Sequence, residues 1–247
     1  MSHFYVRPED IKENIFAING KQAHYVSNVR RFKTADEIMI FDGMGNSYKA
    51  KITSVNKNKI LGNILSHSYK ISDFIVKLYT SIPKGNRFEW LIEKCAEIGV
   101  SEIMPIKTKR SMRAVFSKNK LERYEKISTA ASSQCGRNNI MKINEPLDFK
   151  TACKNAFTDK NFISILPWES ENNSENKVFI NNIFEKKAKY NGGSIFIGPE
   201  GGFESEEVEF AKSLGIQTVT LGNNILRLET AAFVASILTM NFLENFK

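Results

Sequence analysis

The sequence predicts an α/β protein in which a small N-terminal β-barrel precedes a larger C-terminal domain built on a parallel sheet. Short strands with tight turns fill the first 70 or so residues, and strands alternate with helices from residue 75 onward. Two of the later strands each run into a glycine-containing loop that opens a helix. Such alternation is typical of a parallel sheet covered by helices. We therefore expect two domains, residues 1–72 and residues 73–247.

The N-terminal domain contains a strong hairpin signal. Residues 37–41 and 47–52 read as strands and flank Asp-Gly-Met-Gly-Asn at residues 42–46, a composition that favours a tight turn. Several short strands joined by such turns indicate a small barrel. Residues 22–31 are expected to form a short helix or turn.

Hydrophobic periodicity separates strands from helices in the C-terminal domain. The expected strands are residues 75–81, 103–107, 162–166, 194–197 and 218–221. The expected helices are residues 88–98, 121–135, 205–214 and 226–246. The last helix is apolar around much of its circumference and therefore needs burial on more than one face. The sheet on one side and a second subunit on the other would provide this burial, so we expect a homodimer.

Composition excludes several classes of protein. The 247 residues are 42% hydrophobic, as in an ordinary globular protein. No apolar run reaches transmembrane length, and the first residues lack the apolar core of a secretory signal. Cys95, Cys135 and Cys153 are odd in number and widely spaced, which fits neither a disulfide framework nor a zinc site. We expect a cytoplasmic protein with no membrane association and no metal.

The net charge of +8 is unevenly distributed. Residues 1–72 carry +5 and residues 73–140 carry +6, whereas residues 141–247 carry −3. The basic N-terminal half indicates a polyanionic partner, and we expect the reaction to take place in the C-terminal half. The side chains that we expect to contact RNA are Arg7, Arg30, Arg31, Lys109, Arg110, Arg113, Gln134 and Arg137.

Two loops near the end of the chain are expected to form one pocket, because ligands of open α/β sheets bind beyond the carboxyl ends of the strands. The first reads Gly-Pro-Glu-Gly-Gly at residues 198–202, and its glycines allow close approach of backbone to a ligand. The acids Glu204, Glu206 and Glu207 that follow disfavour a phosphate group there. Neither of the usual nucleotide-phosphate motifs occurs in the sequence.

The second loop, residues 221–227, contains apolar side chains that suit the face of an aromatic ring. Arg227 lies at a helix start, where the helix dipole disfavours a cation, so a role toward a substrate is favoured over packing. All three histidines lie in the N-terminal part. Catalytic triads that need a histidine within the α/β domain are therefore excluded.

Residues 197–203 and 221–231 resemble the two signature loops of the SPOUT methyltransferases. The whole pattern is most similar to the ribosomal RNA small subunit methyltransferase E family, with further matches at residues 24–43, 88–100, 109–111 and 134–137. The resemblance implies a PUA-like β-barrel followed by a SPOUT α/β domain with a deep trefoil knot, and a homodimer. It also implies methylation of uridine N3 in 16S rRNA of the small ribosomal subunit, with S-adenosylmethionine as the methyl donor.

Transferred to this sequence, the resemblance assigns the cofactor to the two loops and to the end of the preceding strand. The residues concerned are Leu166, Pro167, Ile197, Gly198, Pro199, Glu200, Gly201, Gly202, Leu221, Gly222, Asn223, Ile225, Leu226 and Thr230. It assigns Arg227, Glu229 and Thr230 to the substrate side. Two positions depart from the family pattern: Ser133 replaces the usual Glu, and Leu228 replaces the usual Thr.

The chemistry requires removal of the N3 proton, because uridine is protonated there at neutral pH. Arg227 could stabilise charge on the uracil oxygens, and either Glu200 or Glu229 could accept the proton; the sequence leaves this choice open. Two other readings also remain open. One is a different SPOUT activity, ribose 2′-O or guanine methylation, and the other is a non-catalytic RNA-binding protein.

Overall fold

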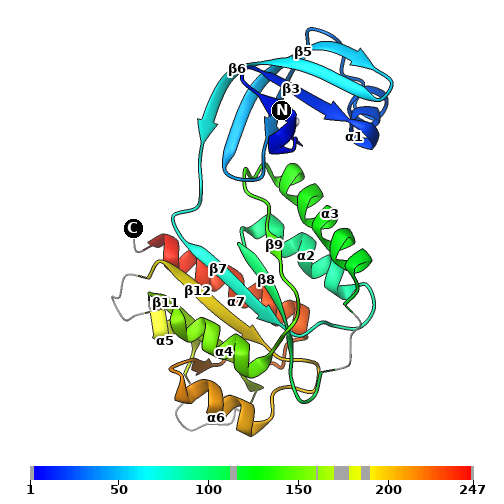
Figure 1. Ribbon diagram of the computed structural model, residues 1–247. Helices are drawn as coiled ribbons and strands as arrows, with labels where there is room; N and C mark the ends of the chain where they lie inside the picture. Colours follow the sequence, from blue (N-terminus) through cyan, green and yellow to red (C-terminus); the bar gives the residue numbers. More distant parts are fainter. Residues whose placement is uncertain (1–2, 112–115, 160, 170–177, 185–189, 246–247) are drawn as a thin grey trace. The chain divides into compact units, whose positions relative to one another are not determined.

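The computed structural model describes residues 3–111, 116–159, 161–169, 178–184 and 190–245. The chain forms two compact units, Met1–Ser72 with Thr129–Ile140 and Asp73–Ser128 with Met141–Lys247 (Figure 1). The domain boundary expected from the sequence, between residues 72 and 73, would put residues 129–140 in the second domain. They group with the N-terminal unit because their backbone pairs there: Gly45 N donates to Asn138 O, and Ile140 N donates to Gly43 O, both at 3.1 Å.

A six-stranded sheet forms the centre of the N-terminal unit, in the spatial order β1, β4, β5, β6, β3, β2. Its strands are β1 (His3–Tyr5), β2 (Ile11–Lys12), β3 (Ile15–Asn19), β4 (Glu37–Phe41), β5 (Asn46–Asn56) and β6 (Lys59–Tyr69). The expected hairpin is confirmed, since β4 pairs antiparallel with β5. Gly43 and Gly45 in its turn have φ of +78° and +105°, which glycine adopts without strain.

Two short helical segments cover the core of this unit. The α-helix α1 (Gly20–His24) continues into the π-helical turn η2 (Tyr25–Val29), so the helix expected near residues 22–31 is present. Ala23 of α1 and Val26 of η2 are fully buried in one apolar cluster with strand residues such as Phe16 and Ile40. The hydrophobic effect on this cluster holds the helical segments against the sheet.

A parallel sheet forms the centre of the C-terminal unit, in the order β10, β8, β7, β12, β11, β13, with β9 also paired to β8. Its strands are β7 (Ile75–Thr80), β8 (Glu102–Lys107), β9 (Lys142–Ile143), β10 (Leu147–Asp148), β11 (Phe162–Pro167), β12 (Gly192–Ile197) and β13 (Gln217–Val219). The five expected strands are confirmed. However, β13 ends at Val219, and Thr220 beyond it forms an isolated β-bridge with Phe179. β12 is central, and all six of its residues are buried.

Helices cover both faces of this sheet, as Figure 1 shows for α7 and α4. The helices of this unit are α2 (Arg87–Ile98), α4 (Phe149–Thr158), α5 (Ile180–Phe184), α6 (Ser205–Ser213) and α7 (Leu228–Asn245), and α3 (Lys118–Cys135) has its first residues in this unit and its last seven in the N-terminal unit. α7 packs on β12, β7 and α2, whereas α4 packs on α6. The short strands β9 and β10 and the helices α4 and α5 are not among the elements expected from the sequence. The clearest local signal among them is that of α4. Its start is marked by Asp148, whose side chain accepts a 2.9 Å hydrogen bond from Thr151 N, as an N-cap does.

Because all strands of the C-terminal unit are parallel, their carboxyl ends meet at one edge. The register shows this directly, since Thr80 of β7 lies opposite Ile197 of β12, and Pro167 of β11 lies opposite Val219 of β13. The loops that follow these strands therefore gather at the edge where open α/β sheets bind ligands. α7 begins at Leu228, two residues later than expected, so Arg227 precedes the helix.

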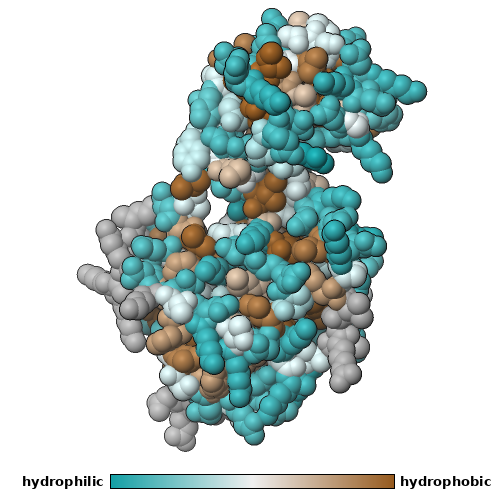
Figure 2. All heavy atoms as spheres, in the orientation of Figure 1, coloured by the Kyte–Doolittle hydropathy of each residue, from teal (hydrophilic) through white to brown (hydrophobic). Residues whose placement is uncertain are grey.

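Hydrophilic side chains cover most of the face shown in Figure 2, and apolar side chains form smaller groups between them. Of the helices within the described ranges, none is both long enough and apolar enough to cross a membrane.

Candidate active site

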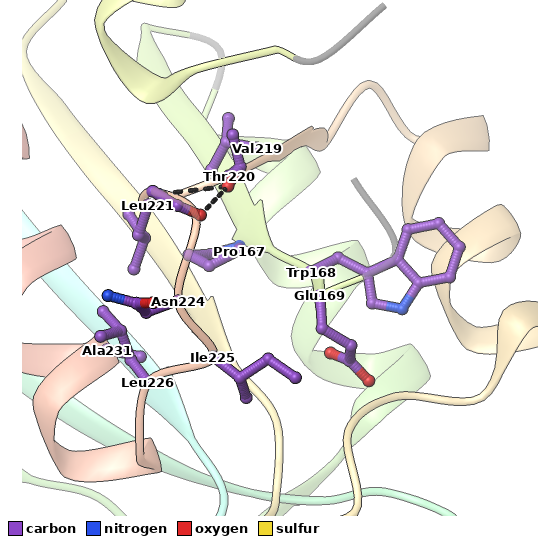
Figure 3. A pocket seen from close by; sticks show the side chains of 11 residues that line it. Pro167, Trp168, Glu169, Val219, Thr220, Leu221, Asn224, Ile225, Leu226 and Ala231 are labelled. Carbon is purple, nitrogen blue, oxygen red and sulfur yellow. Dashed lines mark hydrogen bonds between the residues drawn. The ribbon is translucent and has the colours of Figure 1, made fainter. Parts of the chain in front are cut away.

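A pocket opens between the ends of β11 and β13 and the start of α7 (Figure 3). Most of its described lining residues are apolar, and Glu169 alone among them carries a charge. An apolar pocket with a few polar groups is typical of small-molecule sites. The lining residues are Pro167, Trp168, Glu169, Val219, Thr220, Leu221, Gly222, Asn224, Ile225, Leu226 and Ala231.

The loop after β13 is shaped by Thr220 at its start. The Thr220 hydroxyl donates to Gly222 O at 2.8 Å and accepts from Gly222 N at 3.1 Å. Gly222 has a φ of +136°, which a residue with a side chain rarely adopts. Beyond this turn Ile225 is 81% exposed, and Figure 3 shows the Glu169 side chain directed toward it. An apolar side chain is thus presented to solvent at the pocket wall.

The structure brings five of the residues assigned to the cofactor into the lining of this pocket: Pro167, Leu221, Gly222, Ile225 and Leu226. Leu166 and Ile197 are buried in their strands, while Asn223 and Thr230 are exposed beside lining residues. Asn224 of the second loop also lines the pocket, as do five residues that the sequence does not indicate: Trp168, Glu169, Val219, Thr220 and Ala231. The available signal was position, since several of these residues directly follow or end a strand.

The loop Gly198 to Gly202 lies outside the lining of this pocket but meets it through Glu169. Gly202 N donates to Pro199 O at 2.9 Å, and Gly202 has a φ of +70°. The Glu169 carboxylate occupies the space that a Cβ atom at Gly202 would need. Glu169 therefore connects the pocket with the glycine-rich loop.

The basic residues after β8 hold this loop from the other side. Arg110 Nη1 donates to Gly201 O at 2.7 Å, and Arg110 Nε donates to Glu204 Oε1 at 2.8 Å. Lys109 forms an ion pair with Glu206, and its backbone N–H donates to Glu207 Oε1 at 2.9 Å. Two of the residues expected to contact RNA thus pair with the acidic first turn of α6.

The two carboxylates expected to take part in catalysis share one partner, Arg87, which the sequence analysis does not single out. Arg87 Nη2 lies 2.6 Å from Glu200 Oε1, and Arg87 Nη1 lies 3.5 Å from Glu229 Oε1. Partial burial alone would raise the pKa of Glu200. Hydrogen bonds from backbone N–H groups and the charge of the Arg87 guanidinium lower this pKa by more than burial raises it, so the net shift is downward. Arg87 comes from α2, Glu200 from the first loop and Glu229 from the first turn of α7.

Arg227 occupies the residue before α7 and is exposed. Its carbonyl oxygen accepts the 2.8 Å hydrogen bond from Ala231 N that opens the helix. Within the described part of the chain, its guanidinium forms no ion pair. Leu228, the next residue along the chain, is buried.

The other residues expected to contact RNA lie mostly in the N-terminal unit. Arg7, Arg30, Arg31 and Gln134 are exposed. Arg137 is partly buried, and this burial lowers the pKa of its guanidinium. Arg113 lies outside the described residues. Within the described ranges, no three His, Cys, Asp or Glu side chains are placed to hold a metal ion.

Comparison with known proteins shows the family. The model of the RNA methyltransferase domain matches residues 71–240, and that of the RNA methyltransferase PUA domain matches residues 18–65. Ribosomal RNA small subunit methyltransferase E of Mesomycoplasma hyopneumoniae is 31% identical over 94% of this chain and 96% of its own length.

Two solved structures are similar over almost the whole chain. The first is a ribosomal RNA small subunit methyltransferase E from Neisseria gonorrhoeae bound to S-adenosylmethionine, with 27% identity and a TM-score of 0.81, covering 97% of this chain and 98% of that one. The second comes from Legionella pneumophila, also with the cofactor bound, with 26% identity and a TM-score of 0.81, covering 97% of each chain. The chain described here belongs to the ribosomal RNA small subunit methyltransferase E family.

Proposed function

We propose that this protein transfers the methyl group of S-adenosylmethionine to N3 of a uridine in the 16S rRNA of the small ribosomal subunit. The observation that carries the proposal is the apolar pocket at the carboxyl edge of the sheet. The segment that closes it, between the lining residues Leu226 and Ala231, also contains Glu229, which shares Arg87 with Glu200. Family membership and two cofactor-bound relatives support the cofactor.

The residues of the pocket fit this cofactor. Leu221, Ile225 and Leu226 offer apolar surface to an adenine ring. The Glu169 carboxylate suits the hydroxyl and cationic groups of the cofactor, because a carboxylate accepts hydrogen bonds and attracts positive charge. When bound, the cofactor supplies an electrophilic methyl group on a sulfonium.

The chain's own residues then have separate tasks at the reacting base. Arg227 stabilises the negative charge that develops on the uracil oxygens as the N3 proton leaves. A glutamate accepts that proton. The base must be unpaired to expose N3, so the target uridine is single-stranded or flipped out of its helix. Holding N3 in line with the methyl group supplies a large part of the acceleration.

The partners and setting form part of the same proposal. Arg7, Arg30, Arg31, Gln134 and Arg137 of the N-terminal unit contact the RNA, as does Arg227 beside the pocket. The exposed Ile237 and the half-buried Val234 on α7 belong to a homodimer interface. The enzyme works in the cytoplasm, where its substrate lies, and the C-terminal chain forms a trefoil knot.

The decisive experiment incubates the protein with labelled S-adenosylmethionine and small ribosomal subunits that lack the modification. We expect 3-methyluridine when the RNA is digested and its nucleosides are identified by mass spectrometry. A 2′-O-methylated nucleoside or a methylguanosine would instead establish a different RNA methyltransferase. Calorimetry that detects no cofactor binding would favour a non-catalytic RNA-binding protein.

A further inference from the structure

Arg87 occupies a position that is unfavourable for a cation. It is the first residue of α2, and the amino end of a helix carries partial positive charge. Its Nε donates to Lys84 O at 3.1 Å, and its two terminal nitrogens face Glu200 and Glu229. The two carboxylates offset the unfavourable dipole, so the guanidinium is fixed between the glycine-rich loop and α7.

The two carboxylates differ in their distance from Arg87 and in their exposure to solvent. Glu200 makes a charged hydrogen bond of 2.6 Å and its side chain is 41% exposed. Such a bond stabilises the ionised form, and protonation would weaken it. The same bond ties the loop that contains Glu200 to the start of α2. Glu200 is therefore suited to anchoring the loop rather than to taking up a proton.

One carboxylate oxygen of Glu229 accepts no hydrogen bond from the described residues. Its side chain is only 12% exposed, and its Oε1 lies 3.5 Å from Arg87, beyond a short hydrogen bond. Its Oε2 is buried and has no hydrogen-bond partner among the described residues. A buried carboxylate oxygen without a donor is costly, and a ligand hydrogen or a water that bridges to the ligand would relieve this cost.

We propose that Arg87 is a positioning residue that gives the two carboxylates different tasks, with Glu200 as the anchor of the glycine-rich loop and Glu229 as the proton acceptor. This inference rests on the function proposed above. The N3–H proton passes to Glu229 Oε2, directly or through one water. The electron pair left on N3 forms the bond to the methyl carbon while the carbon–sulfur bond breaks. The two electrons of the broken carbon–sulfur bond stay on the sulfur, which becomes neutral.

The first test compares Glu229→Gln with Glu200→Gln in single-turnover methylation of the unmodified small subunit. We expect Glu229→Gln to lose about 100-fold or more in rate, the usual contribution of a general base, with unchanged cofactor affinity by calorimetry. Glu200→Gln should mainly weaken cofactor binding. A larger loss of single-turnover rate in Glu200→Gln than in Glu229→Gln would overturn the assignment.

The second test uses RNA in which 5-fluorouridine replaces uridine, because fluorine makes N3–H more acidic. A variant that lacks its base should gain more from this substitution than the wild type, and its rate should rise more steeply with pH. A defect that is merely structural would respond to neither change. Equal responses of Glu229→Gln and wild type would therefore reject Glu229 as the acceptor.

The third test addresses Arg87. We expect Arg87→Ala to lower both cofactor affinity and single-turnover rate, and Arg87→Lys to restore part of each, because a lysine can still reach one carboxylate. The matched control is Arg123→Ala, which removes an exposed ion pair with Glu89 at 2.8 Å in the same unit. Arg87→Ala with the wild-type affinity and pH profile would contradict the inference. Absence of all turnover in the wild type would instead count against the proposed function.

Discussion

Arg110 Nη1 donates a 2.7 Å hydrogen bond to the carbonyl oxygen of Gly201, a residue 91 positions later in the chain. Arg110 follows β8, whereas Gly201 follows β12, so a single guanidinium fastens two loops at the carboxyl edge of the sheet. The same guanidinium also donates a hydrogen bond to the side chain of Glu204, the residue that precedes α6. The loop is consequently held at its tip and at its end.

We expect Arg110→Ala to weaken S-adenosylmethionine binding roughly fivefold, because a hydrogen bond from a charged group contributes about 1.5–3 kcal/mol and partial exposure reduces this to about 1 kcal/mol. Calorimetric titration would measure the change. The control is Lys107→Ala, an exposed cation at the end of the same strand. Weaker RNA binding with unchanged cofactor affinity would favour the RNA contact expected from the sequence.

Gly202→Ala should weaken cofactor binding, because its new methyl group would displace the Glu169 carboxylate from its place between the pocket and the loop. It should also cost about 1–2 kcal/mol of stability, since its φ is left-handed. Gly215→Ala is a matched control: Gly215 also has a left-handed φ, +80°, but its Cβ would meet nothing within 4 Å. Denaturant unfolding should give similar losses for both variants. If Gly215→Ala reduced cofactor binding equally, the loss would reflect general instability.

Ile225→Ala separates ligand binding from folding. Ile225 is 81% exposed, so its removal should change the free energy of unfolding by less than about 0.5 kcal/mol. Complete burial of an isoleucine contributes about 1.5–3 kcal/mol, and partial cover by the cofactor should make the variant bind about tenfold more weakly. Ile15→Ala in the N-terminal unit, 55% exposed, should affect neither quantity. An unchanged cofactor affinity for Ile225→Ala would remove this side chain from the binding surface.

Tyr79→Phe should stabilise the protein. Tyr79 is fully buried and stacks on Phe196 with ring centroids 4.6 Å apart, and its hydroxyl finds no partner within the described part of the chain. Removing an unsatisfied buried hydroxyl should raise the free energy of unfolding by about 1 kcal/mol. A loss of stability on urea unfolding would show that the hydroxyl is satisfied, for example by a buried water.

Tyr79 also gives a pH dependence with a definite sign. Burial raises its pKa, so in alkaline solution the folded state keeps a proton that the unfolded state loses. Stability should therefore fall as the pH rises above about 10, the ordinary pKa of tyrosine. Tyr79→Phe should lose less stability than the wild type over that range in parallel urea titrations. Identical alkaline slopes would show that Tyr79 does not contribute.

The sequence by itself determined the features that depend on residues close together in the chain, namely strands, helices and turns. Alternating and periodic apolar positions identified the hairpin of β4 and β5, five strands of the parallel sheet (β7, β8, β11, β12 and β13) and the helices α2, α3, α6 and α7. The two-residue strands β9 and β10 and the helices α4 and α5 were not identified. Glycines identified the two loops, because only residues with special backbone freedom fit there. Since parallel strands place their carboxyl ends at one edge, even the gathering of these loops followed from the pattern.

Only the tertiary structure decided which side chains meet at that edge. Arg87 and Glu200 lie 113 residues apart, and nothing local in either segment indicates the other. For the same reason Lys109 and Arg110 read as free cations in the sequence, although they bind the acids of α6. Charge in a sequence shows how much of each sign is present, whereas pairing depends on distances of a few ångströms that the packing of strands and helices sets.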